Sequence, residues 1–296
     1  ARMTTREKTK LPYLLVFPSL ILLGGILYPF FTAVWYSLTN YRLVGRNFSF
    51  VGLENYIWIF QDEEFIRSVW ITLLYTLIIL LFQIPLGIAI AHLLNKEAPG
   101  LKLVRGLSIV PMMIPPVIGG LMWKTMMDQN GVLNALLGHI GVDPVPWLSS
   151  TRMAFPSIVI IEVWMWLPFV TLILLSGLQS LPQNPYEAAT IDGAGPWRSF
   201  LYITLPLLRP FLTIVLLFRF IDTLKVFDIV FSTTGGGPVN ATKFLQISVY
   251  EEAFIGKNMG IAMAKILVLW AITYIGSFFI VRKLFPSSSP KVKAGE

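Results

Sequence analysis

The chain has 296 residues, of which 55% are hydrophobic and only 13% are charged. Because soluble domains carry about 25% charged residues, this composition favours a membrane protein. No cysteine is present, which excludes disulfides, thiol catalysis and thiolate metal sites. The net charge of +7 would suggest nucleic acid in a soluble protein, but in a membrane protein it is explained by topology and no nucleic-acid partner is expected.

Six apolar segments are long enough to cross a hydrocarbon core of about 30 Å as helices. The sequence therefore predicts an all-α integral membrane protein with six transmembrane helices. The predicted spans are Leu14–Leu38, Val69–Leu94, Leu107–Met127, Ser157–Leu178, Leu207–Phe231 and Gly260–Leu284. Three prolines, Pro111, Pro115 and Pro116, interrupt the third span. That pattern fits either a broken, cavity-lining helix or a simple kink.

The distribution of basic residues predicts the orientation of the chain. Six spans place both termini on one side, and 13 of the 23 lysines and arginines fall on that side, with seven on the other. Basic residues accumulate in cytoplasmic loops. Both termini are therefore predicted to be cytoplasmic, with the positive charge near lipid head groups.

The segment 182–206 is expected to be a compact cytoplasmic loop. Asn184 can cap a helix and Pro185 suits its first position. Glu187 then lies near the positive end of the helix dipole, and Gly193 allows the backbone to reverse. Pro196 can begin a second helix. These signals predict a helix–turn–helix that leads into the fifth span.

Fixed residues in this loop carry a family resemblance. Glu187-Ala188-Ala189, then Gly193, Ile203 and Leu205-Pro206 at their set spacing resemble the EAA loop of binding-protein-dependent ABC import permeases. In that family the loop is a coupling helix that enters a cleft on the ATPase subunit. An ordinary solvated loop is the alternative. The resemblance implies a type I (MetI-like) permease fold, a single permease domain over residues 1–296 with the coupling loop at 182–206, and coupling residues Glu187, Ala188, Ala189, Asp192, Gly193 and Ala194.

The resemblance extends along most of the chain. Val163-Trp164, Pro168-Phe169 and the Gly235–Pro238 run look like the first permease of the maltose and glycerol-phosphate type. The chain departs from the maltose permease in having fewer spans and no large periplasmic insertion. Carried over by these anchors, the implied substrate-pathway residues are Glu162, Met165, Trp166, Phe169, Arg219, Asp222, Thr223 and Val226.

Ionisable residues within spans are functional candidates because they are costly there. The chain places six in its spans: Glu162, Arg219, Asp222, Lys225, Asp228 and Lys265. At about 100° per residue, Arg219, Asp222, Thr223 and Val226 share one helical stripe, which we expect to face a polar cavity. Lys225 and Asp228 turn away from it. The alternative is structural ion pairing, for which Arg219 and Asp222 at i, i+3 would suffice.

The resemblance implies an importer subunit that translocates a sugar or sugar-like solute by alternating access in a bacterial or archaeal inner membrane. Implied partners are a second permease, an ATPase dimer, an extracytoplasmic solute-binding protein and membrane lipid. The chain lacks a G-x-x-x-x-G-K-[ST] phosphate loop, so it is not expected to be an enzyme. It is expected to bind no cofactor or metal. ATP and Mg would lie on the separate ATPase subunit. Alternatives are an anionic glycerol or sugar derivative, a polyol or a peptide as solute, a non-ABC transporter, or a membrane enzyme.

Overall fold

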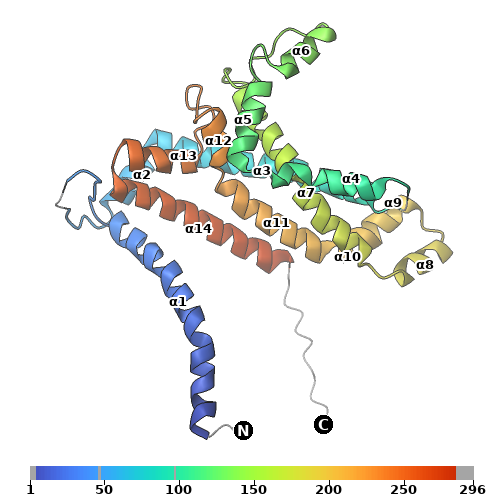
Figure 1. Ribbon diagram of the computed structural model, residues 1–296, viewed down its shortest axis with the longest axis horizontal. Helices are drawn as coiled ribbons and strands as arrows, with labels where there is room; N and C mark the ends of the chain where they lie inside the picture. Colours follow the sequence, from blue (N-terminus) through green and yellow to red (C-terminus); the bar gives the residue numbers. More distant parts are fainter. Residues whose placement is uncertain (1–4, 46–47, 97, 285–296) are drawn as a thin grey trace. The chain divides into compact units, whose positions relative to one another are not determined.

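The computed structural model describes residues 5–45, 48–96 and 98–284, and the regular secondary structure of these residues is helical apart from an isolated bridge between Thr39 and Phe50. Figure 1 follows the elements along the chain. They are α1 (Thr5–Ser37), α2 (Glu54–Gln61), α3 (Glu63–Leu94), α4 (Leu101–Ser108), the 3₁₀ turn η1 (Val110–Met113), α5 (Pro116–Met126), α6 (Val132–His139), α7 (Ala154–Gln179), α8 (Asn184–Ile191), α9 (Pro196–Ser199), the π-helical turn η2 (Phe200–Thr204), α10 (Leu205–Leu207), α11 (Arg209–Leu224), α12 (Asp228–Thr233), α13 (Leu245–Tyr250), the π-helical turn η3 (Glu251–Ile255) and α14 (Met259–Leu284).

Six membrane spans can be drawn through the described residues. Four single helices are long and apolar enough to cross: α3, α7, α14 and the Val16–Ser37 part of α1. Two bent pairs complete the set, one made of α4 and η1 with α5, and one made of α9 to α10 with α11. The all-α, six-span prediction is therefore confirmed, with each bent pair taken as one span.

The third predicted span is broken rather than gently kinked. Its two halves meet at 96°. Ile114, with ψ 128, is extended because the residue before a proline avoids the helical region. Pro115 and Pro116 also lack the N–H groups that would continue the hydrogen-bond ladder. The chain therefore turns sharply before α5 begins.

The fifth predicted span ends earlier than expected. A continuous helix over Leu207–Phe231 is wrong: α11 stops at Leu224, and α12 begins only at Asp228. No glycine or proline marks this break. Val226 within the break and Ile229 in α12 are buried in the core. Tertiary packing therefore overrides the local helical preference here.

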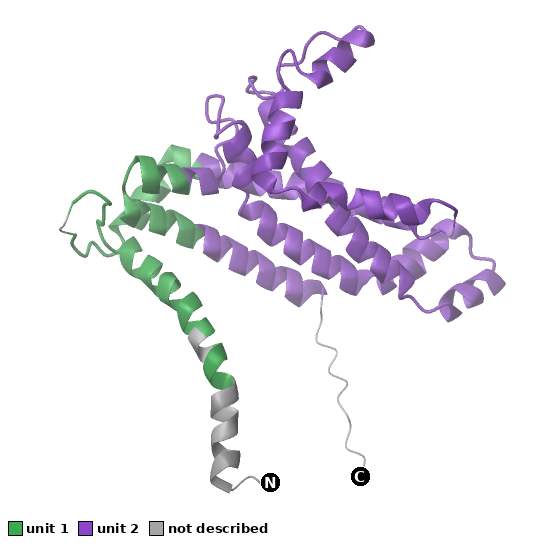
Figure 2. Cartoon of the chain, in the orientation of Figure 1, with its two compact units in different colours: residues 1–66, 249–268 green, residues 67–248, 269–296 purple. Residues whose placement is uncertain are grey.

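The chain divides into two compact units (Figure 2). Unit 1 contains residues 1–66 and 249–268, and unit 2 contains residues 67–248 and 269–296. The boundaries fall within α3, α13 and α14. The assignment of residues 1–296 to a single permease domain stays a prediction.

Unit 1 is held together by polar contacts to backbone oxygens. The buried amide of Asn55 donates to the carbonyl oxygens of Ser37 at 2.7 Å and Thr39 at 2.8 Å. Gly260 of α14 lies against the Thr39 carbonyl, where a Cβ would clash. Lys265, also buried, pairs with Glu252 at 2.9 Å. The predicted in-span charge of Lys265 is thus neutralised within this unit.

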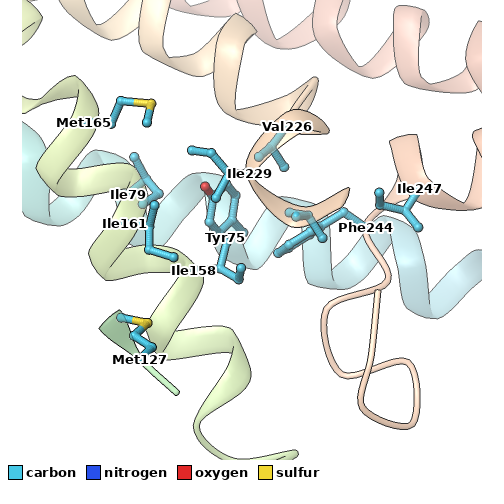
Figure 3. Close-up of a cluster of buried hydrophobic side chains, with 11 residues drawn as sticks. Tyr75, Ile79, Met127, Ile158, Ile161, Met165, Val226, Ile229, Phe244 and Ile247 are labelled. Carbon is cyan, nitrogen blue, oxygen red and sulfur yellow. The ribbon is translucent and has the colours of Figure 1, made fainter. Parts of the chain in front are cut away.

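Unit 2 contains a buried apolar cluster, drawn in Figure 3. Its buried members come from α3, α7, α12 and the segments around them, and they are Tyr75, Ile79, Met127, Ile158, Ile161, Met165, Val226, Ile229, Val230, Phe244 and Ile247. Small residues let the helices approach closely. A Cβ on Gly87 of α3 would meet Val170 of α7, and one on Gly177 of α7 would meet Phe211 of α11. This close packing places α3, α7 and α11 around one polar site.

Candidate functional site

The first half of the predicted coupling loop is the helix α8. It starts at Asn184 with Pro185 in its first turn, and Gln183 precedes it without a side-chain capping bond. Asn184 is therefore the first helical residue and not the cap, which corrects the expectation. Gly193 has φ +72, the left-handed conformation that favours glycine. The Ala194 N–H donates to the Ala189 carbonyl oxygen at 2.9 Å, which closes the helix end.

The second half of the loop leads directly into α11. The short helix α9 continues through η2 into α10, and this segment meets α11 at 65°. The Tyr186 hydroxyl of α8 donates to the hydroxyl oxygen of buried Thr204 in η2 at 2.9 Å. The Leu208 N–H in turn donates to the Thr204 carbonyl oxygen at 2.8 Å. Thr204 therefore connects α8 with the start of α11.

The predicted coupling residues differ in their exposure. Ala189 is buried, Ala194 is partly buried, and the other four (Glu187, Ala188, Asp192 and Gly193) are exposed. The neighbouring Ile191 is 87% exposed. A single exposed apolar side chain does not by itself mark a contact surface. The coupling role of these residues stays a prediction.

Arg219 of α11 is the centre of a buried polar network in unit 2. Its side chain is fully buried and forms an ion pair with Glu162 of α7. Its Nε donates to the Gln83 side-chain oxygen of α3 at 2.9 Å. The Gln83 amide donates in turn to the Glu162 backbone oxygen at 3.0 Å. The guanidinium also lies 5.3 Å from the centre of the Trp166 ring, so three helices are joined through one cation.

Gln83 is a member of the network that was not predicted from the sequence. This residue is fully buried and supplies both a donor and an acceptor to the network. Its signal was an amide within the apolar run of α3, a residue type that bonds across helices in membranes. The cost of a charge within a span singles out ionisable residues, and a neutral amide such as Gln83 falls outside that criterion.

A cavity of about 250 Å³ lies beside this network. Its lining combines an indole ring, one ammonium group and three carboxyl groups. The lining residues are Pro116, Glu162, Trp166, Asp222, Lys225, Val226, Phe227, Asp228 and Ile229. Four predicted pathway residues therefore meet at this cavity: Glu162, Trp166, Asp222 and Val226.

The residues that line the cavity differ from the expected stripe in two respects. Arg219 and Thr223 are fully buried and do not line it; the Thr223 hydroxyl donates to the Arg219 carbonyl oxygen at 2.7 Å. Lys225 and Asp228, expected to point elsewhere, do line it. Lys225 and Asp228 lie beyond Leu224, where α11 ends, so a helical rotation of 100° per residue does not predict their direction.

Met165 and Phe169 pack nearby but not at the cavity. Met165 is buried in the apolar cluster, and Phe169 contacts Phe218 at a ring separation of 6.1 Å. The predicted Arg219–Asp222 pair is present at 3.7 Å, with the Asp222 side chain 44% exposed. Structural ion pairing, the alternative interpretation, thus describes Arg219 in this conformation. Within the described residues, no cluster of three histidine, aspartate or glutamate side chains could hold a metal ion.

Together these features define a polytopic helical membrane protein with an exposed helical loop and a cavity lined by charged side chains. The sequence matches the family described as "Binding-protein-dependent transport system inner membrane component" over residues 83–284. That match covers more than half of the chain. The chain therefore belongs to this family and is a multi-pass permease subunit of an ABC importer in the inner membrane.

Relatives match almost end to end. The chain is 38% identical to the trehalose/maltose transport system permease protein MalF of Thermococcus litoralis, over 87% of this chain and 88% of that protein. It is 34% identical to the sn-glycerol-3-phosphate transport system permease protein UgpA of Yersinia pestis, over 93% and 95%. It is also 34% identical to the sulfoquinovosyl glycerol permease SmoG of Agrobacterium fabrum, over 89% and 86%.

The fold is also found in a solved importer. A chain in the crystal structure of a bacterial ABC transporter involved in the import of the acidic polysaccharide alginate superposes with a TM-score of 0.82. The match covers 95% of this chain and 97% of that one, at 23% identity. The predicted ABC importer permease architecture is therefore confirmed.

Proposed function

We propose that this chain forms half of the translocation pathway for a neutral sugar or sugar-like solute. Its partners would be a second permease, an ATPase dimer that holds ATP and Mg, and an extracytoplasmic solute-binding protein. Both termini and the 182–206 loop would face the cytoplasm, as the excess of basic residues on that side indicates. The membership in a binding-protein-dependent family supports this assembly.

The charges around the cavity support a neutral solute. Glu162, Asp222 and Asp228 contribute three carboxyl groups to the lining, against the single ammonium group of Lys225. Arg219 is already paired with Glu162. No surplus of positive charge is left for an anion such as a phosphate or sulfonate. The relatives MalF and UgpA, named for trehalose/maltose and for glycerol phosphate, show that the family includes both solute classes.

The remaining chemistry of the lining suits a polyhydroxylated ring. The Trp166 indole offers a flat apolar face, and the carboxyl groups of Asp222 and Asp228 accept hydrogen bonds from hydroxyls. This combination of an aromatic wall with a few directional polar groups is common in small-molecule sites. It favours a sugar over a peptide or an apolar solute.

The proposed mechanism is supported by one observation, which is that the 182–206 loop connects to the Arg219 network. The segment from Tyr186 through Thr204 and Leu208 leads into the helix that holds Arg219. The cavity of about 250 Å³ is smaller than the roughly 300–1,000 Å³ of typical ligand pockets. We infer that the ATPase moves this segment and so opens the cavity. Between these movements, the Arg219 network would hold the cavity closed.

Reconstituted importer tests the proposal directly. The assembled complex with its binding protein is assayed for ATP hydrolysis and uptake with a neutral disaccharide and with glycerol 3-phosphate. We expect stimulation by the disaccharide only. Stimulation by glycerol 3-phosphate alone would overturn the neutral-solute assignment without affecting the importer assignment.

The coupling role has its own variant. Glu187→Arg reverses an exposed charge on α8 and should abolish solute-stimulated ATPase activity while the permease still inserts. Arg198→Glu, an exposed charge reversal in the same loop outside the predicted coupling residues, is the matched control and should retain most of that activity. Unchanged stimulation in Glu187→Arg would remove the coupling role.

A further inference from the structure

We propose that a basic cavity at the ends of α3, α4 and α7 binds the phosphate head group of an anionic phospholipid. This cavity has a volume of about 770 Å³ and is distinct from the one beside Arg219. Three basic side chains and three amides contribute to its lining. The lining residues are Asn95, Lys96, Ala98, Pro99, Leu101, Lys102, Arg105, Leu178, Gln179 and Gln183.

The charge of the cavity has one sign. Lys96, Lys102 and Arg105 are basic, and none of the lining residues in the described part of the chain is acidic. Glu97 lies outside the described residues, and the sequence from 95 to 105 remains net positive with it included. Basic pockets between transmembrane helices on the cytoplasmic side are typical sites for anionic head groups.

Arg105 gives the cavity a fixed wall. Its Nε donates to the Leu94 carbonyl oxygen at 3.1 Å, and its Nη2 donates to the same oxygen. Leu94 is the last residue of α3, where backbone carbonyls lack partners within the helix. The last turn of α4, which holds Arg105, is thereby tied to the end of α3, and Lys102 stands one turn earlier on the same anchored helix.

The helix boundaries place the cavity at the membrane surface. The apolar helix α3 ends at Leu94, α7 ends at Gln179, and α4 starts at Leu101. Apolar transmembrane helices end where the hydrocarbon core gives way to head groups. Gln179 and Gln183 also lead into the 182–206 loop, so the cavity lies on the same side as that loop. This is the depth at which lipid phosphates are found.

The helix α4 presents an apolar face next to its basic one. At 100° per residue, Lys102 and Arg105 lie about 60° apart, whereas Leu103, Val104 and Leu107 form the opposite stripe. These three apolar side chains are 68%, 49% and 60% exposed. A phospholipid carries an acyl region directly beside its anionic head, which matches both faces of α4. A free phosphate would use only the basic face, and an ATPase surface would leave the apolar stripe in contact with polar groups.

The test uses the assembled importer in nanodiscs that contain equal amounts of phosphatidylglycerol and phosphatidylcholine. Retained lipid is counted by native mass spectrometry after release from the discs. Wild type should retain phosphatidylglycerol in preference. Because each basic residue near the surface strengthens binding by several-fold, Lys96→Gln/Lys102→Gln should lower that retention about 10- to 30-fold. Arg282→Gln/Lys283→Gln, which removes two charges from the end of α14, should change it less than about twofold.

Three outcomes would overturn the proposal. Equal losses in the two double variants would mean general charge attraction. Displacement of phosphatidylglycerol by millimolar inorganic phosphate would assign the cavity to a soluble anion. Unchanged lipid retention with loss of the co-purifying ATPase in Lys96→Gln/Lys102→Gln would make the cavity part of the ATPase contact.

Discussion

Glu162→Gln is the sharpest perturbation of the buried network, because it removes one charge and keeps the side-chain shape. The glutamine oxygen can still accept from Arg219, so the change isolates the ionic part of the contact. Breaking a buried ion pair by removing one partner costs about 3–5 kcal/mol. Asp222 lies 3.7 Å from the Arg219 guanidinium and its side chain is 44% exposed. Its remaining ion pair with Arg219 can therefore offset no more than about 1 kcal/mol of this loss. We therefore expect the free energy of unfolding to fall by about 3 kcal/mol.

A double-mutant cycle provides the assay. Unfolding of the purified permease complex in mixed micelles is followed by tryptophan fluorescence for Glu162→Gln, Arg219→Gln and the pair. Removing both charges leaves no uncompensated ion, so the double variant should recover about 2–3 kcal/mol relative to the sum of the single losses. Asp228→Asn, an exposed lining residue, is the control and should lose less than about 0.5 kcal/mol. Additive losses, or wild-type stability of Glu162→Gln, would refute the reasoning.

Two substitutions in the loop test its two structural features, the hydrogen bond from Tyr186 to Thr204 and the left-handed turn at Gly193. Tyr186→Phe removes the hydrogen bond to Thr204, worth about 1 kcal/mol, and should lower solute-stimulated ATPase activity several-fold. Tyr202→Phe removes the hydroxyl of an exposed ring and is the control, which should keep that activity. Equal effects of the two variants would exclude a role for the Tyr186–Thr204 bond. Gly193→Ala forces a left-handed residue at φ +72, at about 1 kcal/mol, and should weaken recovery of the complex with its ATPase on pull-down. Gly195→Ala, at φ −69 with open space around it, is the matched control; the same recovery from both variants would contradict the turn argument.

The local features of the loop could be predicted because each depends on residues close in sequence. Two prolines, Pro185 and Pro196, signal helix starts, and Gly193 signals a reversal of the backbone. These signals do not depend on the residues that pack around them. Pro115 and Pro116 likewise indicate an interruption of the third span, but their pattern fits a kink as well as the 96° break that the structure contains. The spans themselves follow from apolar run length, which needs no tertiary contact.

The polar site could be predicted only in part because its contacts are distant in sequence. Arg219 meets Gln83 across 136 positions and Glu162 across 57. A costly charge in a span identifies Arg219 and Glu162 as candidates, but no local pattern states that they pair with one another. The predicted set of cavity-lining residues differs from the structure for another reason. Helical periodicity is valid only within a helix, and the end of α11 at Leu224 has no sequence marker.

The geometry of α11 explains how a small displacement at the loop could act on the network. Arg219 lies ten residues beyond Arg209, the start of α11, which corresponds to about 15 Å along the helix. A tilt of α11 by about 5° at the Leu208 bend would then move Arg219 by roughly 1.3 Å. Its 2.9 Å hydrogen bond to Gln83 would lengthen beyond about 3.5 Å and be lost. The π-helical turn η2, separated from the bend only by α10, is the kind of irregular helix that is frequent at functional sites. The network would thus respond as a switch to a change of a few degrees, and a large movement of the loop is not required to release it.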